Sequence, residues 1–581
     1  MSVRRREFIG AIGALSVMGG AFDAFGVEKP LLRIGVMTDT HIGKTKATCK
    51  RVKLAYRLFR KHAVDLMVNV GDIADYHFPT GYKAYRETVE EVFAKTPKEA
   101  RPKELFVYAG HDYFAYKGAA RKDWQDCATH AFADVQKLIG ASNGPYATGS
   151  IKGFPYVVIP QRMSDGLDFP RCEKMIADAC AANPGKPVFV FAHIPPANTT
   201  GSGRGCPNKM EMFLKYPQVV NISGHTHGSL ADERLIWQGA FTSVNAGCLQ
   251  NWGDGRSGIA GNSVSRINNY GVLIVDVYAT RIVFRRFDVR DGKEYHAQIP
   301  WMIPWPHNPA TAPYAPVNRK DKERVPAFAA DAVLRMEPSK TDDGGVMLAI
   351  PVTAGEPRPF AYRVRLERMD ADGRWVPHAR RDFFGDFWQG AKERPSNHHQ
   401  EFASAYFAEG GKYRFSVAAI NCWGKEGEPI EVVFDAPARK NPVNVAWSCR
   451  NPMEECKFRS GLSGGAPKPR TGDFYEMDKG SARLEIPEEA WEGPAGTPFR
   501  LVVDMHTIQG ADPTWTVVLR NPNPLRNASG RLSTLPGDSG MLRYVIDIKK
   551  LSDTDAYYLL IREGGAGKIR FGSIRVERMH A

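Results

Sequence analysis

Five short apolar runs in the first 225 residues constrain the fold of this chain most strongly, because acidic or histidine residues follow each of them. The runs begin at residues 31, 64, 104, 187 and 219 and read LLRIGVM, VDLMVNV, ELFVYA, PVFVFA and VVNIS. Their length and composition are typical of buried strands, and the stretches between them show helical periodicity. The alternation predicts an α/β domain at the front of the chain.

Polar side chains stand at the end of each predicted strand. The five exits read Thr38-Asp39-Thr40-His41, Gly71-Asp72-Ile73-Ala74-Asp75, Gly110-His111-Asp112, His193, and Gly224-His225-Thr226-His227-Gly228. Ligands of open α/β sheets bind beyond the carboxyl ends of the strands, so these exits bring carboxylates and imidazoles to one edge. A single residue of this kind is usually a surface or satisfied core residue. Five exits together predict a metal site.

The residue types narrow the choice of metal. Mixed Asp and His ligands favour Zn, Mn or Fe, whereas Ca or Mg alone would be expected with oxygen ligands only. Cysteine is absent from the set, which argues against a structural zinc site. With six or more candidate groups, two divalent or trivalent ions fit better than one, and the two carboxylate oxygens of Asp72 can bridge them. A two-metal centre suits in-line phosphoryl displacement, because the ions stabilise both the attacking and the leaving oxygen.

Taken as a set, these motifs resemble those of the calcineurin-like metallophosphoesterases over roughly residues 31–290. The resemblance implies a four-layer αββα sandwich. It also implies a first ion held by Asp39, His41, Asp72 and His227, and a second held by Asp72, His193 and His225. His111 and Asp72 would be the catalytic residues, with His111 acting as general acid on the leaving group or steadying the phosphate.

One position departs from the family pattern. The third family motif reads Gly-Asn-His-Asp/Glu, with Asn ligating the second ion, whereas this chain reads Ala109-Gly110-His111-Asp112. Glycine offers no ligand atom, so three outcomes are open at the second site: water completes it, a neighbour such as Asp112 substitutes, or the ion binds weakly or not at all. We favour a modified but occupied site, because His193 and His225 are both present.

Asp75 has two interpretations. It could be a second-shell group that orients a metal-bound histidine, or a turn or helix-cap residue. The same motif lacks the tyrosine found in the purple acid phosphatase branch, so the sequence does not assign the chain to that branch.

Proline and charged residues mark a boundary behind the α/β region. Residues 300–326 contain seven Pro and the run RKDKER, which is linker composition. Beyond it, strand-like runs alternate with Gly, Pro and Asp turns. The predicted order is a metallophosphoesterase domain, a Pro-rich linker, a fibronectin type III or immunoglobulin-like β-sandwich and a jelly-roll-like β-sandwich. Their bounds are 28–300, 301–326, 327–438 and 441–581.

The N-terminus predicts export. Residues 1–26 contain an arginine cluster, with Arg5-Arg6-Glu7-Phe8-Ile9, followed by an apolar region of signal-peptide length. The cluster resembles a twin-arginine signal, and an ordinary secretory signal is the alternative. The apolar stretch from Phe8 to Phe22 holds 15 residues, fewer than the roughly 20 that a membrane helix needs. We therefore expect a periplasmic or secreted protein without a transmembrane segment.

The net charge of +14 favours an anionic partner. Residues 28–300 hold 36 Lys and Arg against 26 Asp and Glu, so most of the excess lies beside the metal motifs. A small or polymeric phosphoester is the simplest partner, and no nucleic-acid motif is present. Trp447, Trp491 and Trp515 of the C-terminal modules could stack on a glycan, or they could fill the cores of the sandwiches.

Two functions are consistent with the sequence. The first is an exported phosphoesterase that hydrolyses monoesters or diesters with a metal-activated hydroxide at a dinuclear site. The second is a catalytically impaired protein of the same fold, acting as a surface or glycan-binding protein, and Gly110 is the residue that favours it.

Overall fold

The computed structural model places most of the chain in two compact units, which divide near Asn318. The residues it describes are 28–43, 46–74, 80–112, 133, 135–161, 168–200, 205–250, 270–297, 299–388, 394–438, 444–460, 466–468, 470–477, 480–509, 515–520, 530–535, 540–550, 552–553, 556–563 and 567–579. The predicted signal at 1–26 and Asp75 lie outside these residues.

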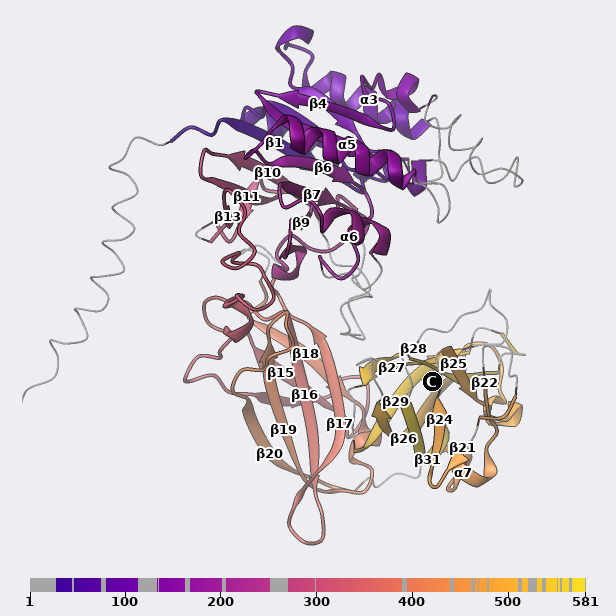
Figure 1. The fold of residues 1–581 in the computed structure, drawn as a ribbon. Coiled ribbons are helices and arrows are strands. Elements are labelled where there is room, and N and C mark those ends of the chain that lie inside the picture. The colour runs from indigo at the N-terminus through magenta and orange to yellow at the C-terminus, as the bar shows by residue number, and fades with distance from the viewer. Residues whose placement is uncertain are drawn as a thin grey trace, which may run out of the picture. The chain divides into compact units, whose positions relative to one another are not determined.

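The N-terminal unit contains two sheets (Figure 1). The first has the strand order β12-β11-β10-β1-β2-β3, and β13 also pairs with β11. Its strands are β1 (Leu32–Met37), β2 (Leu66–Asn69), β3 (Lys103–Phe106), β10 (Gly271–Val277), β11 (Arg281–Asp288), β12 (Lys293–Tyr295) and β13 (Trp301–Pro304). The second sheet has the order β4-β5-β6-β7-β9-β8. Its strands are β4 (Ala147–Ile151), β5 (Phe154–Ile159), β6 (Val188–Ala192), β7 (Val219–Ser223), β8 (Ile236–Gln238) and β9 (Thr242–Asn245).

Three hydrophobic clusters hold this unit together. One joins side chains of both sheets, such as Val36 and Val68 of the first and Phe191 of the second. Another packs the helices α2 (Lys46–Lys61) and α3 (Thr80–Val92) on the first sheet, and a third packs α5 (Phe169–Ala182) and α6 (Pro207–Phe213) on the second. Helices therefore pack on each sheet, and side chains of the two sheets meet in a shared cluster.

All five predicted strands are present, and those that share a sheet run parallel to one another, although β1 also pairs antiparallel with β10. β1, β2 and β3 pair in parallel, as do β5, β6 and β7. Parallel pairing places the carboxyl ends of these strands at one edge of each sheet, as the sequence predicted.

The predicted linker differs from the structure at its start. Residues 301–304 form β13, an edge strand that pairs antiparallel with β11. Trp301 and Ile303 are fully buried in the core between the sheets, and burial of these two side chains outweighs the proline content of the segment. Pro304 is tolerated because it stands at the end of an edge strand. The N-terminal unit thus extends beyond residue 300.

The C-terminal unit begins with two sheets that share one hydrophobic core. Their strand orders are β14-β15-β18 and β17-β16-β19-β20. The strands are β14 (Arg335–Pro338), β15 (Val346–Pro351), β16 (Ala361–Met369), β17 (Trp375–Phe384), β18 (Asn397–Phe402), β19 (Gly411–Ile420) and β20 (Ile430–Ala436). All pairings within them are antiparallel.

Two further antiparallel sheets complete the C-terminal unit. The first contains β21 (Asn444–Cys449), β23 (Arg470–Thr471), β24 (Phe474–Met477), β26 (Pro498–Gln509), β29 (Met541–Lys549) and β31 (Gly567–Arg578). The second contains β22 (Phe458–Ser460), β25 (Gly480–Leu484), β27 (Trp515–Arg520), β28 (Gly530–Leu535) and β30 (Tyr558–Glu563), and the short helix α7 (Pro452–Glu455) follows β21. Trp491 is fully buried against Phe499 and Tyr557, so it fills the core and does not offer its ring to a glycan.

Within the described residues, none of the helices combines the length and the apolar character that crossing a membrane requires.

Candidate metal centre

Four predicted ligands form one tight group in the N-terminal unit. The ligand atoms of Asp39, His41, Asp72 and His227 all lie within 4.8 Å of one another. These are the four residues that the family resemblance assigns to the first ion. They come from the loops after β1, β2 and β7, which shows how the parallel strand order brings distant sequence positions together.

The backbone and a neighbouring hydroxyl orient Asp39. Its Oδ2 accepts hydrogen bonds from Thr38 Oγ1 at 2.8 Å and from the backbone N–H of His225 at 3.0 Å. Its other oxygen, Oδ1, lies 2.8 Å from His227 Nε2 and 3.8 Å from the Nε2 atoms of His41 and His193. Burial alone would raise the pKa of Asp39, but the imidazoles of His227 and His193 hold it well below its ordinary value.

Asp72 lies between this group and His193. One of its oxygens, Oδ1, accepts a hydrogen bond from the backbone N–H of His111 at 2.9 Å, while Oδ2 lies 3.1 Å from His193 Nε2 and 4.0 Å from His41 Nε2. A carboxylate in this position can contact ions on both sides. Although burial raises the pKa of Asp72, the His193 and His41 imidazoles lower it far below the usual range.

The tautomer of His193 follows from its backbone contact. Nδ1 lies 2.8 Å from the carbonyl oxygen of Val70, which can only accept, so Nδ1 carries a proton and Nε2 is the ring nitrogen that faces Asp72. Burial lowers the pKa of His193, but the carboxylates of Asp72 and Asp39 outweigh it and raise that pKa to about 9. This electrostatic environment would attract a cation.

Buried atoms in the centre fit metal ligation. Within the described residues, Asp39 Oδ1 and His193 Nε2 are buried without a hydrogen bond of good geometry. Such atoms are rare in folded proteins unless an ion or water satisfies them. A set of carboxylate oxygens and imidazole nitrogens is also the donor set that Zn, Mn and Fe accept. The side chains that are present therefore fit a transition-metal ion.

The backbone of the centre is strained. Nine described non-glycine residues have positive φ, and five of them are Asp39, His41, Asp72, His225 and His227. Side chains other than glycine rarely adopt this conformation, which costs of order 1 kcal/mol or more per residue. Strain concentrated at these exits indicates a functional site rather than an ordinary set of loops.

Two more of the predicted site residues, His225 and His111, lie beside the group. The ring of His225 lies 5.3 Å from that of His193, centroid to centroid. The ring of His111 packs edge-on against that of His41 at 4.5 Å. His111 is half-buried, and its backbone already contacts Asp72.

Asp112 points to backbone amides. Its Oδ1 accepts from the N–H groups of Ile73 and Ala74 and from the hydroxyl of Tyr82, and its Oδ2 accepts from the N–H of Ala109. The side chain thus joins the loop after β2 to the loop after β3. Burial and the nearby charge of Asp72 raise the pKa of Asp112 to about 6.

The sequence did not single out Gln161, which also reaches this edge of the sheets. It follows β5 by two residues, and its Oε1 accepts a hydrogen bond from the backbone N–H of Gly110 at 3.1 Å. The only sequence signal was the apolar run of β5, FPYVVI, whose exit carries neither Asp nor His.

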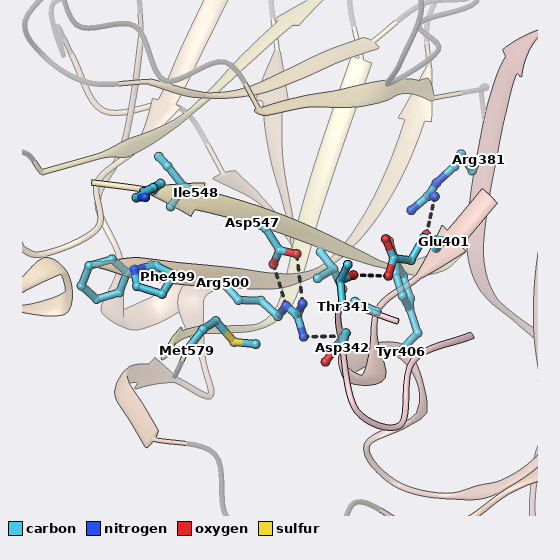
Figure 2. A pocket seen from close by; sticks show the side chains of 14 residues that line it. Thr341, Asp342, Arg381, Glu401, Tyr406, Phe499, Arg500, Asp547, Ile548 and Met579 are labelled. Carbon is cyan, nitrogen blue, oxygen red and sulfur yellow. Dashed lines mark hydrogen bonds and ion pairs between the residues drawn. The ribbon is translucent and has the colours of Figure 1, made fainter. Parts of the chain in front are cut away.

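A separate cavity of about 460 Å³ lies in the C-terminal unit (Figure 2). Its charged lining includes Asp342, Arg381, Glu401, Arg500 and Asp547. Arg500 contacts both Asp342 and Asp547, so basic and acidic groups are paired there. The cavity lacks the convergence of imidazoles and carboxylates that marks the metal centre.

One protein-family model matches part of the N-terminal unit. The family model for calcineurin-like phosphoesterases matches residues 32–229. No curated protein matches the chain significantly.

Several solved structures are similar at low identity. A dimetal phosphatase from Danio rerio is 12% identical with a TM-score of 0.30, and the match covers 44% of this chain and 96% of that one. A purple acid phosphatase from yellow lupin (Lupinus luteus) seeds is 13% identical with a TM-score of 0.33, covering 45% of this chain and 52% of that one. A carbohydrate binding module of a Cellvibrio mixtus lichenase, solved with cellotriose, is 10% identical with a TM-score of 0.15, covering 23% of this chain and 99% of that one.

Proposed function

We propose that the N-terminal unit is a metal-dependent phosphoesterase that hydrolyses phosphomonoesters or phosphodiesters at a dinuclear centre. The observation that carries the proposal is the convergence of Asp39, His41, Asp72 and His227 within 4.8 Å, inside the region that matches the phosphoesterase family model. In this proposal those four residues hold the first ion, and Asp72, His193 and His225 hold the second.

The side chains have distinct roles in the proposed reaction. When bound, two transition-metal ions supply Lewis-acid stabilisation of the phosphoryl oxygens and make water nucleophilic at neutral pH. Asp72 would contribute to both sites, since Oδ1 accepts from the His111 backbone N–H while Oδ2 faces His193. His111, half-buried beside His41, is the group that donates a proton to the leaving oxygen or steadies the phosphate.

Asp112 acts in this proposal as a positioning residue. Four groups donate hydrogen bonds to its carboxylate, and these bonds hold the loops that carry Asp72 and His111 in fixed positions. The sequence offered Asp112 as a substitute ligand, whereas these hydrogen bonds favour a role behind the ligands.

We propose the remaining features on the same basis. The packing order of the N-terminal unit supports the four-layer αββα sandwich, and the paired sheets beyond residue 327 support two β-sandwich modules, the first fibronectin-like. Export through a twin-arginine route to the periplasm or the exterior rests on the sequence of residues 1–26. A glycan as partner of the C-terminal modules stays a hypothesis.

Hydrolysis assays test the proposed function. The full chain, purified without chelators, is assayed with p-nitrophenyl phosphate and bis-p-nitrophenyl phosphate under added Mn, Fe or Zn. We expect metal-dependent release of p-nitrophenol, and the ratio of the two rates distinguishes a monoesterase from a diesterase. Absence of turnover with every ion and both substrates, in protein that binds metal, would favour the catalytically impaired alternative.

A further inference from the structure

The second metal site lacks a protein ligand at Gly110. The residues left to hold that ion are Asp72, His193 and His225, and glycine provides no donor atom at the position where the family has Asn. A neutral oxygen ligand from elsewhere in the chain would complete the set. Its source must lie near both Gly110 and His193.

The sheet topology brings Gln161 to this location. β5 pairs in parallel with β6, and Ile159 lies opposite Ala192 in the register. His193 follows Ala192 directly, and Gln161 follows Ile159 by two residues, so both leave the second sheet at the same edge.

Hydrogen bonds fix Gln161 beside the loop that contains Gly110. The backbone N–H of Gln161 donates to the carbonyl of Tyr108 at 2.8 Å, which joins the β5 exit to the β3 exit. The backbone N–H of Gly110 donates to the side chain of Gln161 at 3.1 Å. Because a backbone N–H is a donor, the side-chain atom that faces it is the amide oxygen. Gln161 is 9% exposed, so this oxygen is held in the interior.

The same loop contacts the bridging carboxylate. His111, the residue after Gly110, donates its backbone N–H to Asp72 Oδ1 at 2.9 Å, and the other oxygen of Asp72 lies 3.1 Å from His193 Nε2. Two consecutive backbone N–H groups, those of Gly110 and His111, therefore donate to Gln161 and to Asp72.

Asp112, the other neighbour, is already engaged. Both of its oxygens accept hydrogen bonds, three of them from backbone N–H groups and one from Tyr82. Turning a carboxylate oxygen toward an ion would leave buried amides without acceptors, which is unfavourable. An amide oxygen such as Gln161 Oε1 has two lone pairs, so it can accept the hydrogen bond from Gly110 N–H and also bind an ion.

We propose that Gln161 replaces the missing Asn as the neutral oxygen ligand of the second metal ion. The proposal rests on the dinuclear centre described above and adds a ligand from a strand that the family motifs do not include. Glutamine supplies the same amide oxygen as asparagine, on a side chain that is one methylene group longer.

Metal binding by the full chain tests the proposal without reference to activity. Metal-free protein is titrated with Mn²⁺ by calorimetry, and the bound metal is counted by elemental analysis. We expect two ions per parent chain. Gln161→Met, which keeps the shape of the side chain but removes the oxygen, should keep the first ion and weaken the second about 10- to 100-fold. Gln161→Glu should retain both ions.

A rescue variant separates ligation from a structural role. Adding Gly110→Asn to Gln161→Met returns the family ligand, so the affinity for the second ion should recover. If Gln161 only supported the Gly110 loop, this addition would not restore the ion, and that result would overturn the proposal. Parental affinity in Gln161→Met, or a parent that binds a single ion at saturation, would overturn it as well.

Gln218 provides the matched control. Its side-chain amide donates to the carbonyls of Asn183 and Lys186, outside the metal centre. Gln218→Met should leave both ions bound with parental affinity. A parent that binds two ions, loses one in Gln161→Met and yet hydrolyses no ester would refute the proposed function while supporting the ligand assignment.

Discussion

Two groups of buried charged residues in this chain differ in what satisfies them. Within the described part of the N-terminal unit, Asp39, Asp72 and His193 converge with no Lys or Arg among their ion-pair partners, and two of their buried atoms lack a good hydrogen bond. In the C-terminal unit, Arg500 and Arg543 are also buried, but each lies between two carboxylates.

The C-terminal group joins the two pairs of sheets. Arg500 of β26 donates to Asp342 at 2.9 Å and to both oxygens of Asp547, at 2.6 and 2.9 Å (Figure 2). Arg543 of β29 contacts Glu409 at 2.7 Å and Asp504 at 2.9 Å. Forked arginine–carboxylate pairs of this kind satisfy both partners.

The backbone conformations differ as well. All of Asp39, His41, Asp72, His225 and His227 have positive φ, whereas none of the arginines or acids of the C-terminal group is among the described residues with positive φ. Burial of charge alone therefore does not identify a functional site. Strain and incompletely satisfied ligand atoms distinguish the candidate metal centre, while complementary charges on regular strands indicate structural support.

The bridging carboxylate should give the largest effect. Asp72→Asn keeps the size of the side chain and an acceptor for the His111 N–H, but it removes the charge that faces both ions. We expect bound metal to fall to near zero and phosphoesterase activity to drop by more than about a hundredfold, since even second-shell changes cost about 10- to 100-fold. Elemental analysis and ester hydrolysis measure the two losses. Retention of both metal and activity would show that the centre lies elsewhere.

Removal of a paired arginine should affect stability and leave metal binding unchanged. Arg500→Met leaves Asp342 buried without its cation, so the free energy of unfolding of the C-terminal unit should fall by about 3 kcal/mol. Chemical denaturation measures this loss of stability, and elemental analysis should show the parental metal content.

Arg374 supplies the control for that variant. It pairs with Asp370 and Asp372 at the surface, where its side chain is 72% exposed. Arg374→Met should cost less than about 1 kcal/mol, because solvent screens exposed pairs. An equal loss for Arg500→Met and Arg374→Met would contradict the structural role of the buried pair.

Lys209 offers a smaller test, because it is buried without a carboxylate partner among its described contacts. Its Nζ donates to the carbonyl of Ile194 at 2.9 Å, and burial lowers its pKa from 10.5 to about 8. Between pH 8 and 10.5 the unfolded chain binds more protons at this residue than the folded one, so its unfavourable contribution is full below pH 8 and disappears above pH 10.5. Lys209→Met should therefore be more stable than the parent at pH 7, and the difference in stability between the two proteins should be smaller at pH 10. Denaturation midpoints that stay a constant distance apart at both pH values would refute this.

The sequence predicted the exits of β1, β2, β3, β6 and β7 because apolar runs followed by Asp and His can be recognised without a structure. It missed the β4–β5 hairpin, since β4 is polar and largely exposed and the β5 exit carries only Gln161. The sequence also missed β13, because the prolines around this strand are typical of a linker. The contact of Arg500 with Asp342 joins residues 158 positions apart, and no local pattern indicates such a pairing.

Anomalous diffraction from crystals of the full chain, recorded at the Mn, Fe and Zn absorption edges, tests the central claim most directly. We predict one metal peak among Asp39, His41, Asp72 and His227, and a second beside His193 and His225 on the other side of Asp72. Metal-soaked crystals with no peak at these residues, or with peaks only elsewhere in the chain, would contradict a dinuclear centre at the strand exits.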